Sequence, residues 1–163
     1  MDTNDRAPII RSINNDHIAP VRFVNTTMHN VQLLWINYDG QAVSYGTLSP
    51  GDTLAISTFA THPWIFLEPV TTERFVVDGK DVFYPEPWFD KYRGFPRSQI
   101  PKEIPPELVY ITLPMRTLRD IALRSIKSIL YDDNDAYLLD IPKNLQEELA
   151  TLEPRKNAAS RRN

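Results

Sequence analysis

The chain has 163 residues, a formal net charge of −3, and hydrophobic and charged fractions of 42% and 24%, values typical of a soluble globular protein with a sizeable core. The sequence contains no cysteine, which excludes a disulfide framework, a thiolate nucleophile and cysteine-ligated zinc. The small net charge gives no overall attraction to nucleic acid or anionic lipid. The polar N-terminus and short apolar runs argue against a signal peptide or a membrane span, so we expect a cytoplasmic and nuclear protein.

The first half of the chain has the period-two pattern of β-strands. In residues 31–36, for example, Val31, Leu33 and Trp35 share one face. Asp39-Gly40 and Asp78-Gly79 are turn signals, and residues 74–77 are expected to pair with residues 81–84 around the second one. Six or seven short strands with such turns predict an antiparallel β-sandwich over residues 8–84, with candidate strands at residues 21–25, 31–36, 41–48, 52–59, 64–67, 74–77 and 81–84.

Residues 85–106 contain six of the fourteen prolines and therefore predict neither a helix nor a central strand. We expect a connector over residues 85–110, packed down locally by Trp88, Phe89 and Tyr92.

The final third has helical periodicity. Residues 117–130 predict an amphipathic helix, with Thr117 and Asp120 spaced as in a capping box. A second helix is expected to begin near Pro142. Together they predict a small helical domain over residues 111–153, between a disordered start (1–7) and a disordered basic tail (154–163). The apolar helix faces must contact either the sandwich or another protein, and the pattern leaves both open.

Several short strings, in this order and at these spacings, resemble the von Hippel–Lindau family. They are RSIN (residues 11–14), WINYDG (35–40), Tyr45 with Thr47-Leu48, Pro50-Gly51, IST (56–58), HPW (62–64) and ITLP (111–114). The resemblance covers about residues 8–152 and implies a mainly β fold with added α: an N-terminal antiparallel β-sandwich followed by a small C-terminal helical domain.

The resemblance further implies the substrate-recognition subunit of an elongin–cullin ubiquitin ligase, which is not an enzyme and uses no cofactor, metal or catalytic residue. Its expected partners are elongin C (with elongin B), a cullin scaffold and the prolyl-hydroxylated alpha subunit of hypoxia-inducible factor, without nucleic acid, membrane or homo-oligomer. The residues expected to bind elongin C are Thr117, Leu118, Ile121, Ala122 and Ile126. Those expected to select the cullin are Ile141, Pro142, Leu145 and Leu149.

The implied hydroxyproline pocket comprises Trp35, Tyr45, Thr58, His62 and Trp64, with Asn14, Ser57 and Phe59 around the peptide. Aromatic walls suit the flat apolar ring of proline, and a hydroxyl with an imidazole can pair its added 4-hydroxyl group. The chain departs from the family pattern at Thr58 (a serine), Phe59 (a tyrosine) and Gly46 (a proline), and its connector is longer.

Other interpretations remain for these residues. Tryptophans on alternating strands are most often sandwich core. A β-sandwich adaptor that binds proline-rich peptides without hydroxylation is the alternative function, and no nucleophile elbow or phosphate-binding loop favours an enzyme. The hairpin geometry bears on the pocket. A two-residue turn at Asp39-Gly40 would put Trp35 and Tyr45 on opposite faces, whereas a loop of residues 38–40 puts them on one face, and we predict the latter.

Overall fold

A computed structural model describes residues 9–152, so the predicted disordered segments 1–7 and 154–163 lie outside the described residues. The chain forms two compact units, the first ending at Pro114 and the second beginning at Met115, and each is described by itself. Within residues 9–152, no helix combines the length and the apolar character needed to cross a membrane.

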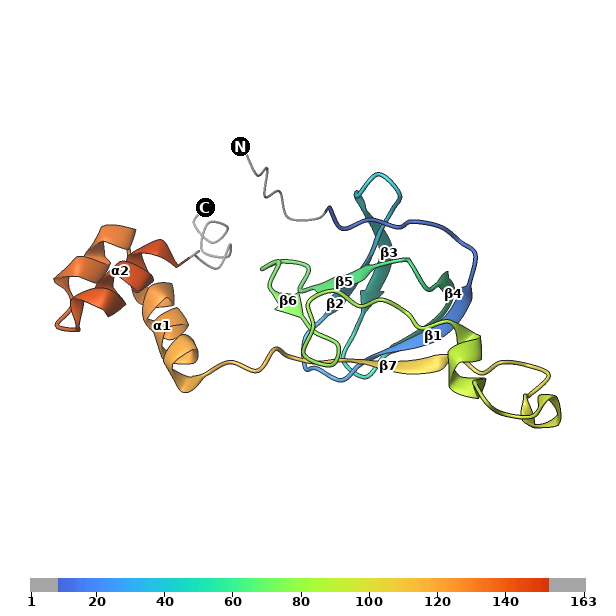
Figure 1. The fold of residues 1–163 in the computed structure, drawn as a ribbon. Coiled ribbons are helices and arrows are strands. Elements are labelled where there is room, and N and C mark those ends of the chain that lie inside the picture. The colour runs from blue at the N-terminus through green and yellow to red at the C-terminus, as the bar shows by residue number, and fades with distance from the viewer. Residues whose placement is uncertain (1–8, 153–163) are drawn as a thin grey trace. The chain divides into compact units, whose positions relative to one another are not determined.

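The first unit contains a three-stranded and a four-stranded sheet (Figure 1). The three-stranded sheet has the order β4-β1-β7, with bounds Thr53–Phe59, Ile18–Asn25 and Glu107–Ile111. The four-stranded sheet has the order β3-β2-β5-β6, with bounds Ala42–Leu48, Val31–Ile36, Trp64–Leu67 and Arg74–Phe75. The predicted fold class, a β-sandwich followed by a small helical domain, is confirmed.

Alternation along the strands builds the core of the first unit. Val21 and Phe23 of β1 are completely buried, as are Val31 and Leu33 of β2. All four belong to one buried cluster that also contains residues of β5, β6 and β7. The period-two pattern therefore puts one face of each sheet against the other, as in other sandwiches.

The predicted boundary of the sandwich at residue 84 is wrong, because residues 107–111 return as strand β7. This strand pairs in parallel with β1, with Phe23 opposite Val109. Val109 and Ile111 are buried in the core. This segment of five residues follows two prolines. It is too short for its alternating pattern to be distinguished from that of an extended connector. Between them and residue 84 the chain forms two short 3₁₀ helices, η1 (Trp88–Tyr92) and η2 (Arg97–Gln99).

The expected turn at Asp78-Gly79 is present, but the expected pairing of residues 74–77 with 81–84 around it is wrong. Asp78 and Gly79 have φ of +50° and +75°, and Val77 and Lys80 exchange backbone hydrogen bonds around them. Phe83 pairs instead with Trp64 of β5, and Val76 pairs with Thr112. The turn was recognisable from Asp-Gly, but the partners of the flanking residues lie elsewhere in the sandwich.

The second unit contains α1 (Leu118–Ile129), the 3₁₀ helix η3 (Asp133–Leu138) and α2 (Lys143–Thr151). The N-cap of α1 agrees with the sequence, because the Thr117 hydroxyl accepts from the backbone N–H of Asp120 at 3.1 Å. Pro142 precedes α2, as expected for its start. The core of the unit consists of Leu123, Ala136 and Leu149 with half-buried neighbours.

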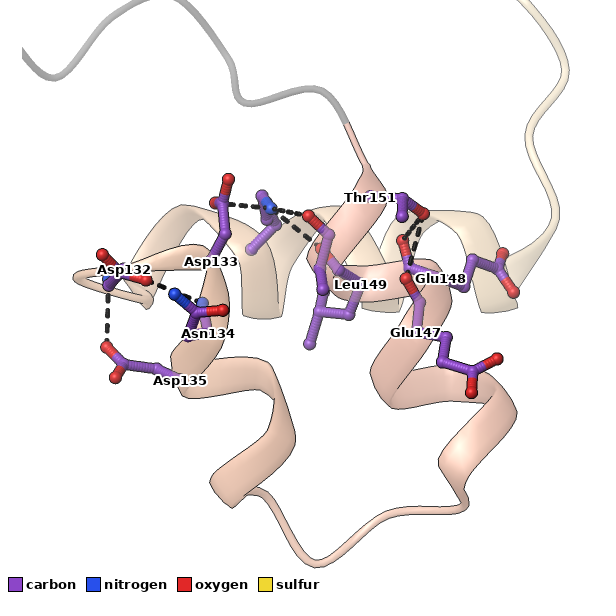
Figure 2. Close-up of polar contacts among 10 residues, drawn as sticks. Asp132, Asp133, Asn134, Asp135, Glu147, Glu148, Leu149 and Thr151 are labelled. Atoms are coloured by element: carbon purple, nitrogen blue, oxygen red, sulfur yellow. Dashed lines mark hydrogen bonds and ion pairs between the residues drawn. The ribbon is translucent and has the colours of Figure 1, made fainter.

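A buried lysine joins the three helices of this unit. Lys127 Nζ lies 2.9 Å from the Leu149 carbonyl oxygen, 3.2 Å from that of Ala150 and 2.7 Å from Asp133 Oδ1 (Figure 2). Only 5% of the Lys127 side chain is exposed. The two carbonyls belong to the last turn of α2, where the helix itself provides no donors and a cation interacts favourably with the helix dipole. Lys127 therefore holds the end of α2 against α1 and η3.

Replacement of Lys127 by methionine should destabilise the helical unit selectively. The change keeps the length of the side chain but leaves the α2 carbonyls and Asp133 without the ammonium group. We expect α2 amides to exchange with solvent at least about tenfold faster, because an unsatisfied buried polar group costs about 1–3 kcal/mol. Amide hydrogen exchange measures this, with the exposed Lys143→Met as control. Unchanged α2 exchange would contradict the structural role of Lys127.

Candidate functional site

One continuous aromatic cluster lies on the sandwich at β2, β3 and the turn between β4 and β5. Trp35 stacks on the His62 imidazole, with ring centroids 5.1 Å apart and planes at 30°. The Phe59 ring lies 5.0 Å from the same imidazole. Tyr45 packs edge-on against Trp64 at 4.9 Å. The structure thus brings together the four ring residues that the sequence assigned to the pocket, together with Phe59, which was expected next to the peptide.

The β2–β3 hairpin agrees with the predicted three-residue loop. The Asn37 N–H donates to the Gln41 carbonyl oxygen at 2.9 Å, and Gly40 has φ of +78°. Residues 38–40 therefore connect the strands, and Trp35 lies opposite Val43. This register favours placing Trp35 and Tyr45 on the same face of the sheet, and their ring centroids are 6.2 Å apart.

A β-bulge at Tyr45 completes this arrangement and was not predicted. Leu34 pairs with Ser44, but Leu33 pairs with Gly46, so Tyr45 is the extra residue. Gly46 has φ of +113°, which no proline can adopt because its ring holds φ near −65°. A proline at position 46 is therefore incompatible with the conformation of this segment.

Two polar side chains lie among the rings. Thr58 is 2% exposed, and its hydroxyl oxygen accepts from the Trp64 indole N–H at 3.2 Å. The Thr58 proton and its second lone pair are not used in that bond. His62 is 7% exposed, and this burial lowers the pKa of its imidazole, an effect that a hydrogen bond to the Asn14 backbone partly offsets. His62 is therefore a neutral group with one donor and one acceptor at neutral pH.

The segment before β1 contributes anchors to the cluster. The Asn14 N–H donates to the Thr61 hydroxyl at 3.0 Å, and that hydroxyl donates to the Asn14 carbonyl oxygen at 2.7 Å. These bonds hold Asn14 next to the turn that carries His62. Ser57 is exposed and lies on β4 between Ile56 and the buried Thr58. Asn14 thus adjoins the cluster, and Ser57 lies on the strand that carries Thr58 and Phe59.

Sequence reasoning missed two residues of the site, Ser12 and Tyr38. The Ser12 hydroxyl accepts from the Trp35 indole N–H at 2.8 Å and donates to the Ile36 carbonyl oxygen at 2.6 Å. The Tyr38 hydroxyl oxygen lies 3.2 Å from His62 Nε2. Both residues stood inside quoted strings, RSIN and WINYDG, but no local pattern indicates these partners.

Three of the predicted elongin-binding residues, Leu118, Ile121 and Ala122, form an exposed apolar stripe on α1. Leu118 is 85% exposed, and Ile121, Ala122 and the N-cap Thr117 are exposed as well. Ile126 differs, because it is half-buried against the core of the helical unit.

The predicted cullin-selecting residues lie mainly inside the helical unit. Leu149 is completely buried, and Ile141 and Leu145 are half-buried beside it. Of this set only Pro142 is exposed. Within residues 9–152, no group of three or more His, Asp and Glu side chains is placed to hold a metal ion.

Comparison with known proteins identifies the class and then the family. The family model described as VHL beta domain matches residues 10–99, more than half of the chain and all of the aromatic cluster. The Drosophila melanogaster protein named Protein Vhl is 30% identical over 145 residues, covering 81% of this chain and 76% of that protein. The chain is thus a VHL beta domain followed by a small helical unit, and it belongs to the von Hippel–Lindau family.

Replacement of Ser12 by alanine should lower the free energy of unfolding by about 1–2 kcal/mol, because the Trp35 indole N–H loses its acceptor. Denaturant unfolding followed by tryptophan fluorescence measures the change. Ser57→Ala removes the same hydroxyl from an exposed position and should change stability by less than about 0.5 kcal/mol. Equal effects of the two substitutions would show that Ser12 does not anchor Trp35.

Proposed function

We propose that this protein is the substrate-recognition subunit of an elongin–cullin ubiquitin ligase, and that its sandwich binds the prolyl-hydroxylated alpha subunit of hypoxia-inducible factor. One observation carries the proposal: a buried hydroxyl and a buried neutral imidazole, Thr58 and His62, lie within a cluster of aromatic rings. Family membership supports a recognition role of this type. The assignment of the peptide and of the ligase partners extends beyond that membership.

The rings of the cluster suit a proline. Its pyrrolidine ring is apolar and lacks a backbone N–H, so it packs well against flat aromatic walls such as Trp35, Tyr45 and Trp64. The bound segment would be extended, close to the polyproline conformation that proline already favours. Ordering the peptide therefore costs little conformational entropy.

Thr58 and His62 supply the preference for the hydroxylated form. A 4-hydroxyl group needs a donor and an acceptor. Thr58 keeps its proton and one lone pair after accepting from Trp64, and the ring N–H of His62 can move from the Asn14 backbone to the ligand. Unmodified proline would enter the same pocket without pairing them. Each buried group left unpaired costs about 1–3 kcal/mol, which is the physical origin of selection against proline.

The exposed stripe on α1 supports docking on elongin C, which would bring elongin B with it. Leu118 and Ala122 are four residues apart on one face, and Ile121 lies beside them. Insertion of one apolar helix face into a partner's groove is a common recognition mode.

The cullin would be selected through the shape of the helical unit. Because Leu149 is buried and Leu145 half-buried, these residues would act by holding η3 and α2 in place, and exposed Pro142 would be the direct contact. The chain would bring substrate and ligase together in the cytoplasm and nucleus, and other subunits would transfer ubiquitin. Its contribution is therefore proximity rather than bond chemistry.

The pocket assignment is tested with one peptide of the hypoxia-inducible factor alpha subunit, synthesised with proline and with 4-hydroxyproline. We expect the full chain to prefer the hydroxylated peptide by at least about a hundredfold, as sites built around a hydroxyl do. Thr58→Val and His62→Ala should abolish the preference, whereas Thr58→Ser should retain it. Calorimetric titration gives both affinities.

Two other results would reject the pocket assignment. Equal binding of both peptides would indicate an adaptor for proline-rich segments that ignores hydroxylation. Binding of neither would leave the α1 stripe as a docking face and require another substrate signal.

Leu118→Gln should weaken binding of a purified elongin B–elongin C complex by at least about thirtyfold, the effect of losing one central apolar contact in an interface. Met115→Gln is the matched control, because Met115 is also fully exposed but precedes the helix. Circular dichroism checks that both variants keep their helices. Equal affinities for the two variants would exclude the α1 stripe as the docking face.

A further inference from the structure

We propose that Tyr38 is a positioning residue for hydroxyl recognition: its phenol donates to His62 Nε2 and keeps the single ring proton of His62 on Nδ1. The proposal rests on the proposed function of the pocket and adds a residue to it. The Tyr38 hydroxyl oxygen is 3.2 Å from Nε2, and the Tyr38 ring meets the imidazole edge-on at 5.6 Å. Tyr38 also packs against Trp35 at 6.1 Å, so its ring is held from two sides.

The direction of this hydrogen bond follows from the chemistry of the two groups. Burial lowers the pKa of His62, so the imidazole is neutral and carries one N–H. A phenol can donate or accept, but its acidic proton makes donation to a basic imidazole nitrogen the stronger arrangement. Nε2 is then the acceptor of the ring, and the proton resides on Nδ1.

The backbone of Asn14 agrees with this assignment. Its hydrogen bond raises the pKa of His62, which means that it accepts a proton from the ring, as a backbone carbonyl does. The same carbonyl already accepts from the Thr61 hydroxyl at 2.7 Å. When the ring N–H donates to a bound ligand instead, the Asn14 carbonyl oxygen still accepts from the Thr61 hydroxyl.

With the proton on Nδ1, His62 and Thr58 make complementary hydrogen bonds to the 4-hydroxyl group. His62 donates to the oxygen of the 4-hydroxyl group, and the hydroxyl proton goes to the free lone pair of Thr58, whose other lone pair accepts from Trp64. Without the Tyr38 phenol, only the Asn14 backbone favours the tautomer with Nδ1 protonated, so the other tautomer, which lacks this donor, becomes populated. Tyr38 thus acts through His62 and needs no contact with the peptide.

Tyr38→Phe tests the proposal, because it removes only the hydroxyl and keeps the ring. The chain has three histidines, so a two-bond proton–nitrogen spectrum of the free protein, assigned with His62→Ala, reports the His62 tautomer directly. We expect one tautomer with Nδ1 protonated in the natural protein and a mixture in Tyr38→Phe. Tyr110→Phe is the matched control, since it removes the same hydroxyl from an exposed position on β7 that has no assigned role in the pocket.

The affinity readout uses the same pair of peptides. Tyr38→Phe should weaken binding of the hydroxyproline peptide about fivefold, the net value of one ordinary hydrogen bond, and leave the proline peptide unchanged. An unchanged tautomer, or an equal loss for both peptides, would overturn the positioning role. If the natural protein fails to distinguish the peptides, the proposed pocket fails, while the spectrum of the free protein still decides whether Tyr38 fixes the tautomer.

Discussion

The register of the β2–β3 hairpin is the constraint on which the candidate site depends. Side chains alternate with a period of two, so a slip of one residue would move Trp35 to the other face of the sheet. The loop of residues 38–40 sets this register, with Gly40 at φ of +78°, and the bulge at Tyr45 turns a second ring toward the first. The loop that sets the register also carries Tyr38 to His62, so one local geometry assembles most of the cluster.

Burial of polar groups explains why the cluster is ordered before any ligand is bound. Ser12 and Thr58 are each 2% exposed, and each accepts from a tryptophan indole N–H. Among the described residues, no buried side-chain nitrogen or oxygen lacks a partner. A hydroxyl uses only part of its bonding capacity in such an anchor. The groups that orient the rings can therefore also read a ligand, which links the stability of the site to its selectivity.

The helical unit is small, and α1 carries apolar side chains on two of its faces. One face of α1 carries Leu123 and Lys127 into the unit, while Leu118 and Ile121 stay exposed. The internal core is small, and Lys127 stabilises it by donating hydrogen bonds to the carbonyl oxygens at the end of α2. This arrangement leaves the outer stripe outside the core of the helical unit.

The sequence by itself determined the features that depend on neighbouring residues. The strand alternation around Trp35, the Asp-Gly turns, the Thr117 cap and the start of α2 near Pro142 were all predictable, because each is encoded within a few positions. Family strings also identified the rings that meet in the cluster.

Only the tertiary structure decided which distant groups become partners. It added β7, whose hydrogen-bonded partner β1 lies more than 80 residues earlier, and it paired Ser12 with Trp35 and Tyr38 with His62 across 23 and 24 positions. It also placed Leu149 inside the helical unit and left Ser57 exposed. Local periodicity indicates whether a side chain faces inward or outward. Which group it contacts there is determined by how the sheets pack in the first unit and the helices in the second.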